Sequence, residues 1–341
     1  MKKLAVGVIG LRMGKLHAEA AKTFGAKIGG ICDPDPERLD EARRDLKVPR
    51  KNCFADYREM LANTKLDAVI IASPDMAHRE QVEACLEAGL HIMCEKPLAL
   101  TREDLVGIVE AVRAHPECKF MVGQICRFTP AFVKAKELVD AGRIGELYFV
   151  ESEYAHDYHK MFEGELLNWR AHPARHGVIG GGCHAVDLLR WIVGRDPVEV
   201  FGYGTHKMLP KVPYDDATIA VMKFPDEVMG KVFVSTGCKR NYTMRTVLYG
   251  TRGTLIFDNK SPTMQLFEMN EDGHGAGTPK ELEVTLADHN AVAEFASFGR
   301  ALTEDAPIET GVLEGAKTVA ACIAIVESTK SGKPVAPNYD F

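Results

Sequence analysis

A glycine-rich turn near the start of the chain is the first place where the sequence could do chemistry. Gly7, Gly10 and Gly14 fall in the stretch GVIGLRMG, between an apolar run of strand length and a segment of helical period. In a dinucleotide fold, the backbone amides of such a turn and the N-terminus of the following helix hold the pyrophosphate. Gly10 suits the tight turn and Gly14 suits close helix packing, but the central glycine that lets a phosphate approach is either replaced by Arg12 or deleted.

Asp33 strengthens the dinucleotide interpretation. It follows Gly10 by 23 residues, at the end of the second predicted strand, where a carboxylate accepts the hydroxyls of the adenosine ribose and repels a 2′-phosphate. Pro34 follows it with no adjacent basic residue, and Asp35 adds a negative charge, so the pattern predicts NAD over NADP. Arg12 is the contrary observation, because its guanidinium could reach a 2′-phosphate. The alternative is an ordinary glycine turn beside a surface aspartate.

A second motif, Cys94-Glu95-Lys96-Pro97-Leu98, ends another predicted strand. A parallel sheet places its ligand crevice at the carboxyl ends of its strands. Lys96 is therefore available there as a cation or proton donor. A solvated Glu-Lys turn is the alternative.

A third motif places three glycines, Gly180 to Gly182, before a predicted helix that carries His184 and Asp187. At helical spacing these two side chains share a face and can point together into a cleft. A histidine can accept or return a proton near neutral pH. The alternative is a packed histidine with Asp187 paired to Arg190 at i,i+3.

The first 123 residues predict the scaffold that these motifs need. Apolar runs of strand length alternate there with segments of helical period, which is typical of a parallel sheet wrapped by helices. Strands are expected over 4–10, 27–32, 68–72, 91–94 and 119–123. Helices are expected over 13–24, 37–46, 79–88 and from Thr101, where Asp104 completes a capping box.

After Gly123 consecutive strand-like segments dominate, and they indicate an antiparallel sheet. Strands are expected over 146–154, 198–205, 218–224, 228–236 and 245–257, and helices over 131–141, 184–193, 292–302 and 312–329. The change of pattern after Gly123 predicts an α/β domain over 1–123 and an α+β domain over 124–341.

Composition excludes several classes of protein. A length of 341 residues suits two domains. The chain has 42 basic and 48 acidic side chains, a net charge of −6 with no basic excess in either half, so neither nucleic acid nor a membrane is an expected partner. No stretch reaches the ~18 apolar residues that span a bilayer.

Glycines interrupt the apolar run after Lys3, so we expect the mature chain to begin near Met1. Nine scattered cysteines without a C-x-x-C favour neither disulfides nor zinc, and they fit a reducing cytoplasm.

Together the motifs resemble the Gfo/Idh/MocA family, which includes glucose-fructose oxidoreductase, inositol dehydrogenase and their relatives. The resemblance covers nearly the whole chain, in order. It rests on Gly10, Gly14 and His17, the stretch DPDPER from Asp33 to Arg38, Ser73-Pro74 with His78, Glu95 to Leu98, Arg127-Phe128-x-Pro130, Gly142-x-Ile144-Gly145, Trp169-Arg170, and the helix of His184 and Asp187.

The resemblance implies a Rossmann domain followed by an α+β domain with a large, mostly antiparallel open sheet that often forms an oligomer interface, here in a homodimer or homotetramer. It also implies NAD(P)-dependent hydride transfer at a hydroxyl of a sugar, cyclitol or related polyol. Lys96 would contact the nicotinamide ribose and the substrate hydroxyl, and His184 would be the acid/base. The implied substrate-binding residues are Asp187, Arg127, Tyr154, Trp169 and Arg170. The implied cofactor-binding residues are Gly10, Arg12, Met13, Gly14, Asp33, Ser73, Pro74, His78, Glu95, Lys96 and Gln124.

Two positions depart from the family pattern. Family members often carry an aspartate four residues before the histidine, and here that residue is Gly180. Arg12 in the phosphate turn is the other departure. The first changes the environment of His184, and the second bears on cofactor binding.

Three hypotheses follow. In a dehydrogenase, Lys96 would polarise the reacting hydroxyl and His184 would remove its proton, while NAD supplies the redox chemistry. A lyase or glycosidase that uses NAD in an internal redox cycle is motivated by Gly180. A non-catalytic dinucleotide-binding regulator is motivated by Arg12 and Gly180, although the presence of Lys96 and His184 opposes it.

A group of histidines before the glycine run raises the question of a metal. His156, Asp157, His159, His172 and His176 fall close together in sequence. A metal needs three or four ligands in fixed geometry, which spacing alone does not establish. We therefore expect no metal and assign these side chains to lining the polyol site.

Overall fold

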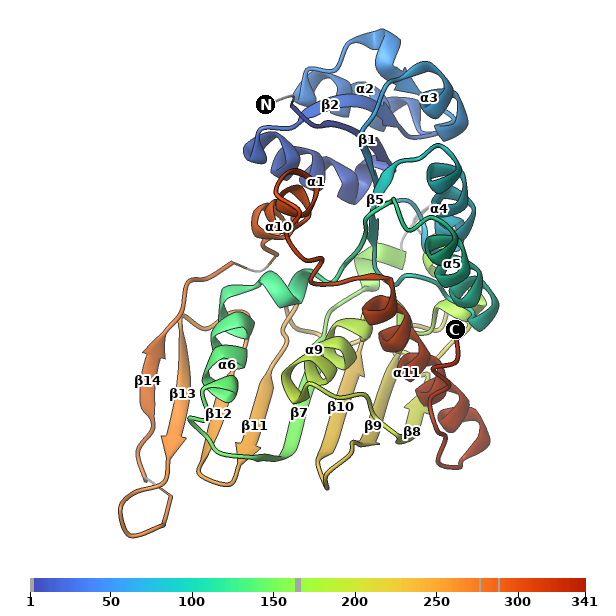
Figure 1. Cartoon of the computed structure of the whole chain (residues 1–341). Coiled ribbons are helices and arrows are strands. Elements are labelled where there is room, and N and C mark those ends of the chain that lie inside the picture. Colours follow the sequence, from blue (N-terminus) through green and yellow to red (C-terminus); the bar gives the residue numbers. More distant parts are fainter. Residues whose placement is uncertain (1–2, 163–166, 276, 288) are drawn as a thin grey trace. The chain divides into compact units, whose positions relative to one another are not determined.

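The computed structural model describes residues 3–162, 167–275, 277–287 and 289–341. The chain divides into two compact units (Figure 1). The first comprises residues up to 125 together with 290–316 and 341, and the second comprises 126–289 and 317–340. The sequence predicts a continuous second domain over 124–341, whereas residues 290–316 pack within the first unit.

The first unit is built on a six-stranded parallel sheet in the order β3-β2-β1-β4-β5-β6. This is the strand order of a Rossmann fold, as predicted. Its strands are β1 (Ala5–Ile9), β2 (Lys27–Cys32), β3 (Cys53–Phe54), β4 (Ala68–Ile71), β5 (His91–Glu95) and β6 (Phe120–Gly123). The central strands are apolar and almost wholly buried, because helices cover a parallel sheet on both faces.

Several helices of the first unit begin or end at capping residues. Asp35 and Asp56 accept backbone N–H groups at two N-termini, Thr101 does so at a third, and Gly25 ends α1 in the left-handed conformation. The helices are α1 (Leu11–Phe24), α2 (Pro36–Leu46), α3 (Tyr57–Asn63), α4 (His78–Glu87), α5 (Arg102–Ala114) and α10 (Ala291–Thr303).

Helix α10 packs on α1 (Figure 1). The rings of Phe24 and Phe295 meet edge to face at 5.9 Å. Gly299 allows this approach, because a Cβ there would lie 2.6 Å from Cζ of Phe24. These contacts explain why residues 290–316 belong to the first unit.

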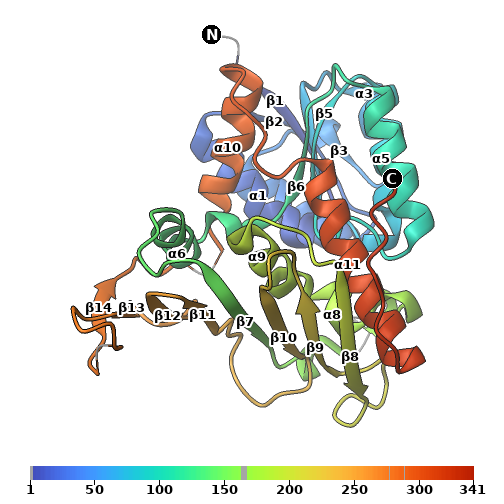
Figure 2. The same ribbon diagram turned by 60° about the horizontal axis from the view of Figure 1, so that its bottom comes forward.

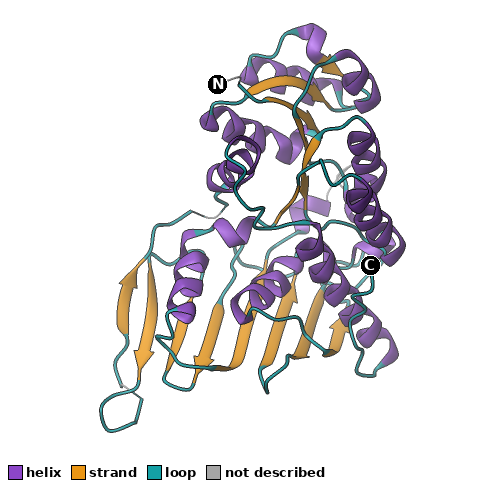
Figure 3. Cartoon of the chain, viewed as in Figure 1, coloured by secondary structure: helices purple, strands orange, loops and turns teal. Residues whose placement is uncertain are grey.

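The second unit is built on an eight-stranded sheet in the order β14-β13-β12-β11-β7-β10-β9-β8 (Figure 3). Only the β7–β10 pair is parallel among the described ladders, so the sheet is mostly antiparallel, as predicted. Its strands are β7 (Leu147–Ala155), β8 (Glu199–Thr205), β9 (Ala217–Lys223), β10 (Met229–Ser235), β11 (Thr246–Gly250), β12 (Gly253–Phe257), β13 (Thr263–Glu268) and β14 (Lys280–Glu283).

The longer helices of the described residues lie on one face of this sheet (Figure 2). They are α6 (Pro130–Asp140), α9 (Cys183–Val193) and the part of α11 (Val312–Ser331) that belongs to the second unit, while α7 (Leu167–Arg170) and α8 (Gly177–Gly180) are short. The opposite face carries exposed apolar side chains, among them Tyr203, Ile219, Val221 and Met229. Cross-strand pairing places these residues on the same face.

Some elements differ from the predicted ones. The stretch 245–257, predicted as one strand, is the hairpin β11–β12, because Thr251 and Arg252 turn and donate to the carbonyls of Glu146 and Ile144. The elements β3, α3, β13 and β14 were not predicted. Within the described part of the chain, none of the helices has the length and hydropathy needed to cross a bilayer.

Candidate functional site

The residues singled out in the sequence fall in both units. In the first unit they follow the carboxyl ends of β1, β2, β4, β5 and β6. Because these strands are parallel, their carboxyl ends share one edge of the sheet.

The turn between β1 and α1 depends on its glycines. Gly10 has φ +83°, and a Cβ there would lie 2.6 Å from the carbonyl oxygen of Ala72. A Cβ on Gly14 would lie 2.7 Å from Cγ1 of Val8. Side chains at these positions would therefore push α1 away from the sheet and the β4 loop. Arg12 and Met13 are exposed on the first turn of α1, which begins at Leu11.

Asp33 is buried beside this turn. Its Oδ2 accepts the backbone N–H of Leu11 at 2.8 Å, and its Oδ1 accepts that of Asp35 at 3.0 Å. Arg38 of α2 lies 3.4 Å from the same carboxylate and 2.7 Å from the Asp35 carboxylate. No basic residue is adjacent to Asp33 in the sequence, so the contact with Arg38 was not predicted. The first turn of α2 brings Arg38 back toward Asp33.

His78 joins the loops that follow β4 and β5. One ring nitrogen lies 3.2 Å from the carbonyl oxygen of Ser73, and the other lies 3.1 Å from that of Pro97. The Ser73 hydroxyl donates to Gln81 at 2.6 Å, and Pro74 lies between Ser73 and the helical turn that leads to His78. His78 therefore has a positioning role for both loops.

Glu95 anchors the backbone of Lys96. Its Oε2 accepts the Lys96 N–H at 3.0 Å, and its Oε1 lies 2.6 Å from Nε2 of His17. Burial alone raises the pKa of Glu95, but the hydrogen bond and charge of His17 outweigh it and lower the pKa to about 2. Glu95 is therefore a carboxylate at all ordinary pH values.

The fit of this edge to a dinucleotide can be tested on Gln124, which follows β6. Its side chain is only 2% exposed, and its Oε1 has no hydrogen-bond partner among the described residues. A buried acceptor without a partner is costly unless a ligand or water satisfies it. Together with the Gly10 turn and the Asp33 carboxylate, it makes this edge fit a dinucleotide.

In the second unit, His184 lies near the start of α9 and is buried. Its Nδ1 is 3.4 Å from Sγ of Cys126, which also contacts Sδ of Met244 at 3.7 Å. Tyr154 of β7 stacks on the imidazole with ring centres 6.1 Å apart. A thiol thus approaches Nδ1, and sequence spacing gave no indication of it because residues 126 and 184 are far apart in the chain.

Further aromatic rings surround His184. His289 lies 6.0 Å from its ring centre, and Tyr242 packs against both Tyr154 and His289. The Tyr154 hydroxyl is 2.6 Å from that of Tyr158, and burial raises the pKa of Tyr154 well above its usual value. This cluster joins flat apolar surfaces to hydroxyls and imidazoles, which suits a polyol. Tyr242 and His289 were not predicted.

Asp187, by contrast, is completely buried and saturated by protein groups. Arg127 donates to its two oxygens at 2.9 and 2.7 Å, and Thr318 donates to Oδ1 at 2.8 Å. Arg190 is 3.8 Å away and donates instead to Thr318 and Asp196. The predicted substrate residues Asp187 and Arg127 therefore form a buried ion pair that ties α9 to the segment before α6.

The glycine run makes room for large neighbours. A Cβ on Gly181 would lie 2.6 Å from the Tyr154 ring. At Gly180, a side chain would collide with the guanidinium of the buried Arg175. That guanidinium lies 4.8 Å from the ring centre of Trp169, which Arg170 covers at 4.0 Å.

The histidines considered as metal ligands separate into different contacts. His159 pairs with Asp157 at 2.5 Å, His172 accepts the backbone N–H of Ala174, and burial lowers the pKa of His176 to about 4. Across the described residues, no three His, Cys, Asp or Glu side chains are gathered as metal ligands would be.

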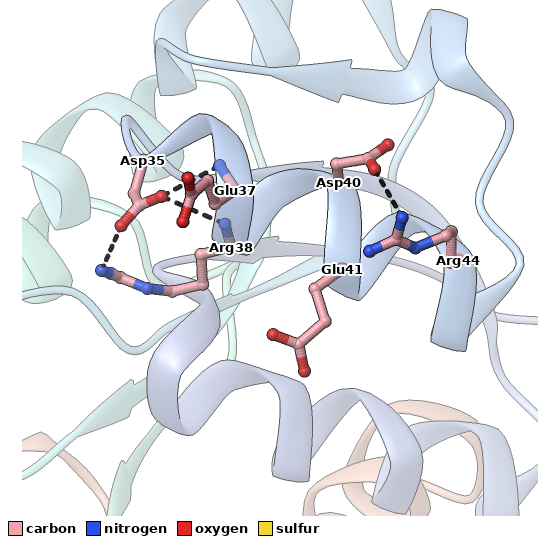
Figure 4. Close-up of a pocket in the computed structure, with 6 residues that line it drawn as sticks. All are labelled: Asp35, Glu37, Arg38, Asp40, Glu41 and Arg44. Carbon is pink, nitrogen blue, oxygen red and sulfur yellow. Dashed lines mark hydrogen bonds and ion pairs between the residues drawn. The ribbon is translucent and has the colours of Figure 1, made fainter.

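A hollow of about 670 Å³ lies on the outer surface of α2 and is lined by charged side chains only (Figure 4). Arg38 pairs there with Asp35, Arg44 pairs with Asp40, and Glu41 pairs with Lys15 of α1. These pairs largely neutralise one another, so the hollow is a charged surface, which reaches the predicted site only through the contact of Arg38 with Asp33.

Comparison with known proteins agrees with this geometry. Residues 4–124 match the family model described as an oxidoreductase family with an NAD-binding Rossmann fold, and residues 132–256 match that of the GFO/IDH/MocA C-terminal domain. The chain belongs to the Gfo/Idh/MocA family. Its first unit is accordingly an NAD-binding Rossmann domain, and the protein is an oxidoreductase of this family.

Named relatives of the family cover most of the chain. Inositol 2-dehydrogenase 2 of Saccharopolyspora erythraea is 28% identical over 73% of this chain and 72% of its own length. Myo-inositol 2-dehydrogenase of Thermotoga maritima is 28% identical over 80% of each chain. A solved structure of levoglucosan dehydrogenase in complex with NADH shares the fold, with a TM-score of 0.88 at 24% identity over 99% of this chain and all of its own.

Proposed function

We propose that this protein is an NAD-dependent dehydrogenase that oxidises a hydroxyl of a cyclitol, sugar or related polyol. The observation that carries the proposal is that Lys96 and His184 are both present, each held in place within an NAD-binding family. Glu95 fixes the backbone of Lys96, and aromatic rings with the Cys126 thiol enclose His184.

The two residues take complementary roles. The Lys96 ammonium donates to the reacting oxygen and stabilises the alkoxide that develops there. His184 accepts the hydroxyl proton. When bound, NAD supplies the electron-pair acceptor for the oxidation. Asp33 and the Gly10 turn would hold its adenosine ribose and pyrophosphate, with Gln124 available for a further contact.

Substrate chemistry is inferred from the surroundings of His184 and from the relatives. Tyr154, Tyr158, Tyr242, His156 and His289 offer rings for the apolar face of a cyclic polyol and polar atoms for its hydroxyls. Relatives named for inositol and levoglucosan act on cyclic compounds rich in oxygen. We therefore place cyclitols and anhydro-sugars first among candidate substrates.

The test is a stoichiometry experiment. Purified protein with added NAD is screened against cyclitols, aldoses, anhydro-sugars and glycosides, and NADH and organic product are both quantified. The dehydrogenase predicts one NADH for each ketone formed. A product without net NADH would support the redox-assisted lyase instead. Tight NAD binding without any product would support the regulator.

We also propose that the open sheet face of the second unit joins two or more copies of the chain. Its exposed Tyr203, Ile219, Val221 and Met229 place apolar side chains on one face of β8, β9 and β10, with Lys223 and Lys231 among them. Sedimentation should give a dimer or tetramer, and Val221→Glu should dissociate it. A wild-type monomer at micromolar concentration would contradict this proposal.

A further inference from the structure

Three ionisable side chains are buried together behind Lys96, and the proposed reaction does not use them directly. They are His17 on α1, Glu95 at the end of β5 and Glu294 on α10, and we call them the buried array. The side chains of His17 and Glu294 are fully buried, and that of Glu95 is 12% exposed. Ionisable groups stay inside a protein when partners compensate for their lost hydration or when the group becomes neutral.

The array is connected to Lys96 through Glu95. One oxygen of Glu95 accepts the Lys96 N–H at 3.0 Å, and the other lies 2.6 Å from Nε2 of His17. Both carboxylate oxygens are therefore fixed. Any movement of His17 would pass to the Glu95 carboxylate and then to the backbone that carries Lys96.

Glu294 faces the far side of His17. Its Oε2 is 3.8 Å from Nδ1 of His17, and that nitrogen and both Glu294 oxygens have no hydrogen-bond partner among the described residues. The Phe24–Phe295 contact holds α10 against α1, so Glu294 cannot leave this position without disrupting the helix pair. An acid without hydrogen bonds in such a place needs a reason beyond packing.

We propose that His17 and Glu294 are positioning residues for Lys96 that act through Glu95. The proposal rests on the proposed function only for the catalytic role of Lys96. The array holds the Lys96 backbone whichever substrate the enzyme takes.

Protonation of the array follows from its geometry. The charged groups that face Glu294 are His17 from α1 and Glu95 and Lys96 from the end of β5. Burial raises the pKa of Glu294 to about 8. Burial lowers the pKa of His17, but the hydrogen bond and charge of Glu95 and the charge of Glu294 raise it overall. These pKa shifts favour a neutral Glu294, a protonated His17 and an ionised Glu95.

The array should change when Glu294 ionises. The ionised Glu294 carboxylate then attracts the His17 ring from its Nδ1 side, away from Glu95 on the Nε2 side, and the hold of Glu95 on the Lys96 N–H weakens. The predicted consequence is a loss of order at Lys96 above about pH 8.

Two variants of His17 test the connection to Lys96. His17→Leu removes the ring nitrogens, and His17→Gln keeps an N–H donor. Hydrogen exchange of the Lys96 amide, followed by NMR, should be about tenfold faster or more in His17→Leu and partly restored in His17→Gln, while the other β5 amides keep their protection. The matched control is Ser297→Ala, which alters a buried residue of α10 outside the array. An unchanged Lys96 amide, or uniform loss of protection throughout β5, would overturn the proposal.

Glu294→Gln tests the other end of the array. In the wild type, both the protection of the Lys96 amide and kcat should decline above about pH 8. In Glu294→Gln that decline should disappear, and NADH affinity measured by fluorescence should change less than kcat. An identical alkaline decline in the two proteins would overturn the role of Glu294. If wild-type protein oxidises no hydroxyl substrate, the proposed function fails. Hydrogen exchange of the Lys96 amide still tests whether the buried array positions the Lys96 backbone.

Discussion

Replacing Glu294 by Gln should stabilise the protein, and the gain should grow with pH. Burial raises the pKa of Glu294 from 4.5 to about 8 in the folded chain, whereas the unfolded chain ionises it near the ordinary value. Between these pH values the folded state holds a proton that the unfolded state has released, so stability falls as pH rises. Each pH unit costs about 1.4 kcal/mol, which amounts to roughly 3 kcal/mol at pH 7. Gln keeps the shape and removes the titration.

Thermal unfolding of the two proteins at about pH 5, 7 and 8.5 measures this effect. The Tm of Glu294→Gln should be close to that of the wild type at the lowest pH and several degrees above it at the highest. Glu304→Gln is the control, because Glu304 is exposed at the end of the same helix and should give no such trend. The burial of Glu294 as an acid would be refuted if the Tm of Glu294→Gln did not rise above that of the wild type with increasing pH, or if it fell further below it.

Three other substitutions test separate parts of the structure. Asp187→Asn leaves the buried Arg127 without its carboxylate and should cost about 3–5 kcal/mol in urea unfolding, and a loss below ~1 kcal/mol would contradict the importance of this pair. Cys126→Asp places an anion beside His184 and should move the acidic limb of the kcat profile up by about one pH unit, with Cys126→Ser as the control, whereas an unmoved limb would contradict the contact. Asp33→Ser should raise the affinity for NADP relative to NAD by about tenfold, and a wild type that prefers NADP in fluorescence titration would reverse the cofactor assignment.

The sequence predicted those helices and strands in which the spacing of apolar residues matches the side chains that are buried in the structure. The strand-turn-helix around Gly10, the strand before Lys96 and the helix of His184 all have apolar periodicity that survives in the fold. Their capping residues and glycines lie within a few residues of the helix or strand itself, so a local sequence pattern reveals them. The parallel sheet of the first unit followed from the alternation of strands and helices, and the mostly antiparallel sheet of the second unit followed from its consecutive strands.

The rest depends on contacts that no local pattern encodes. The strand β3 has only two residues, Cys53 and Phe54, and it exists because it pairs with β2. Glu294 looks like a solvent-facing position of an ordinary helix until α10 packs on α1. Cys126 reaches His184 across a separation of 58 residues. Asp187 was expected to face substrate, but Arg127, far from it in sequence, occupies both of its oxygens.

In the proposed reaction, Lys96 acts on the substrate hydroxyl during oxidation. Pre-steady-state formation of NADH, measured with a substrate found in the polyol screen, separates this step from cofactor binding. Lys96→Met should slow that step by about 10² or more while NADH affinity stays within about threefold of the wild-type value, because the ammonium is needed most as the alkoxide develops. A Lys96→Met enzyme that forms NADH at the wild-type rate would contradict the account.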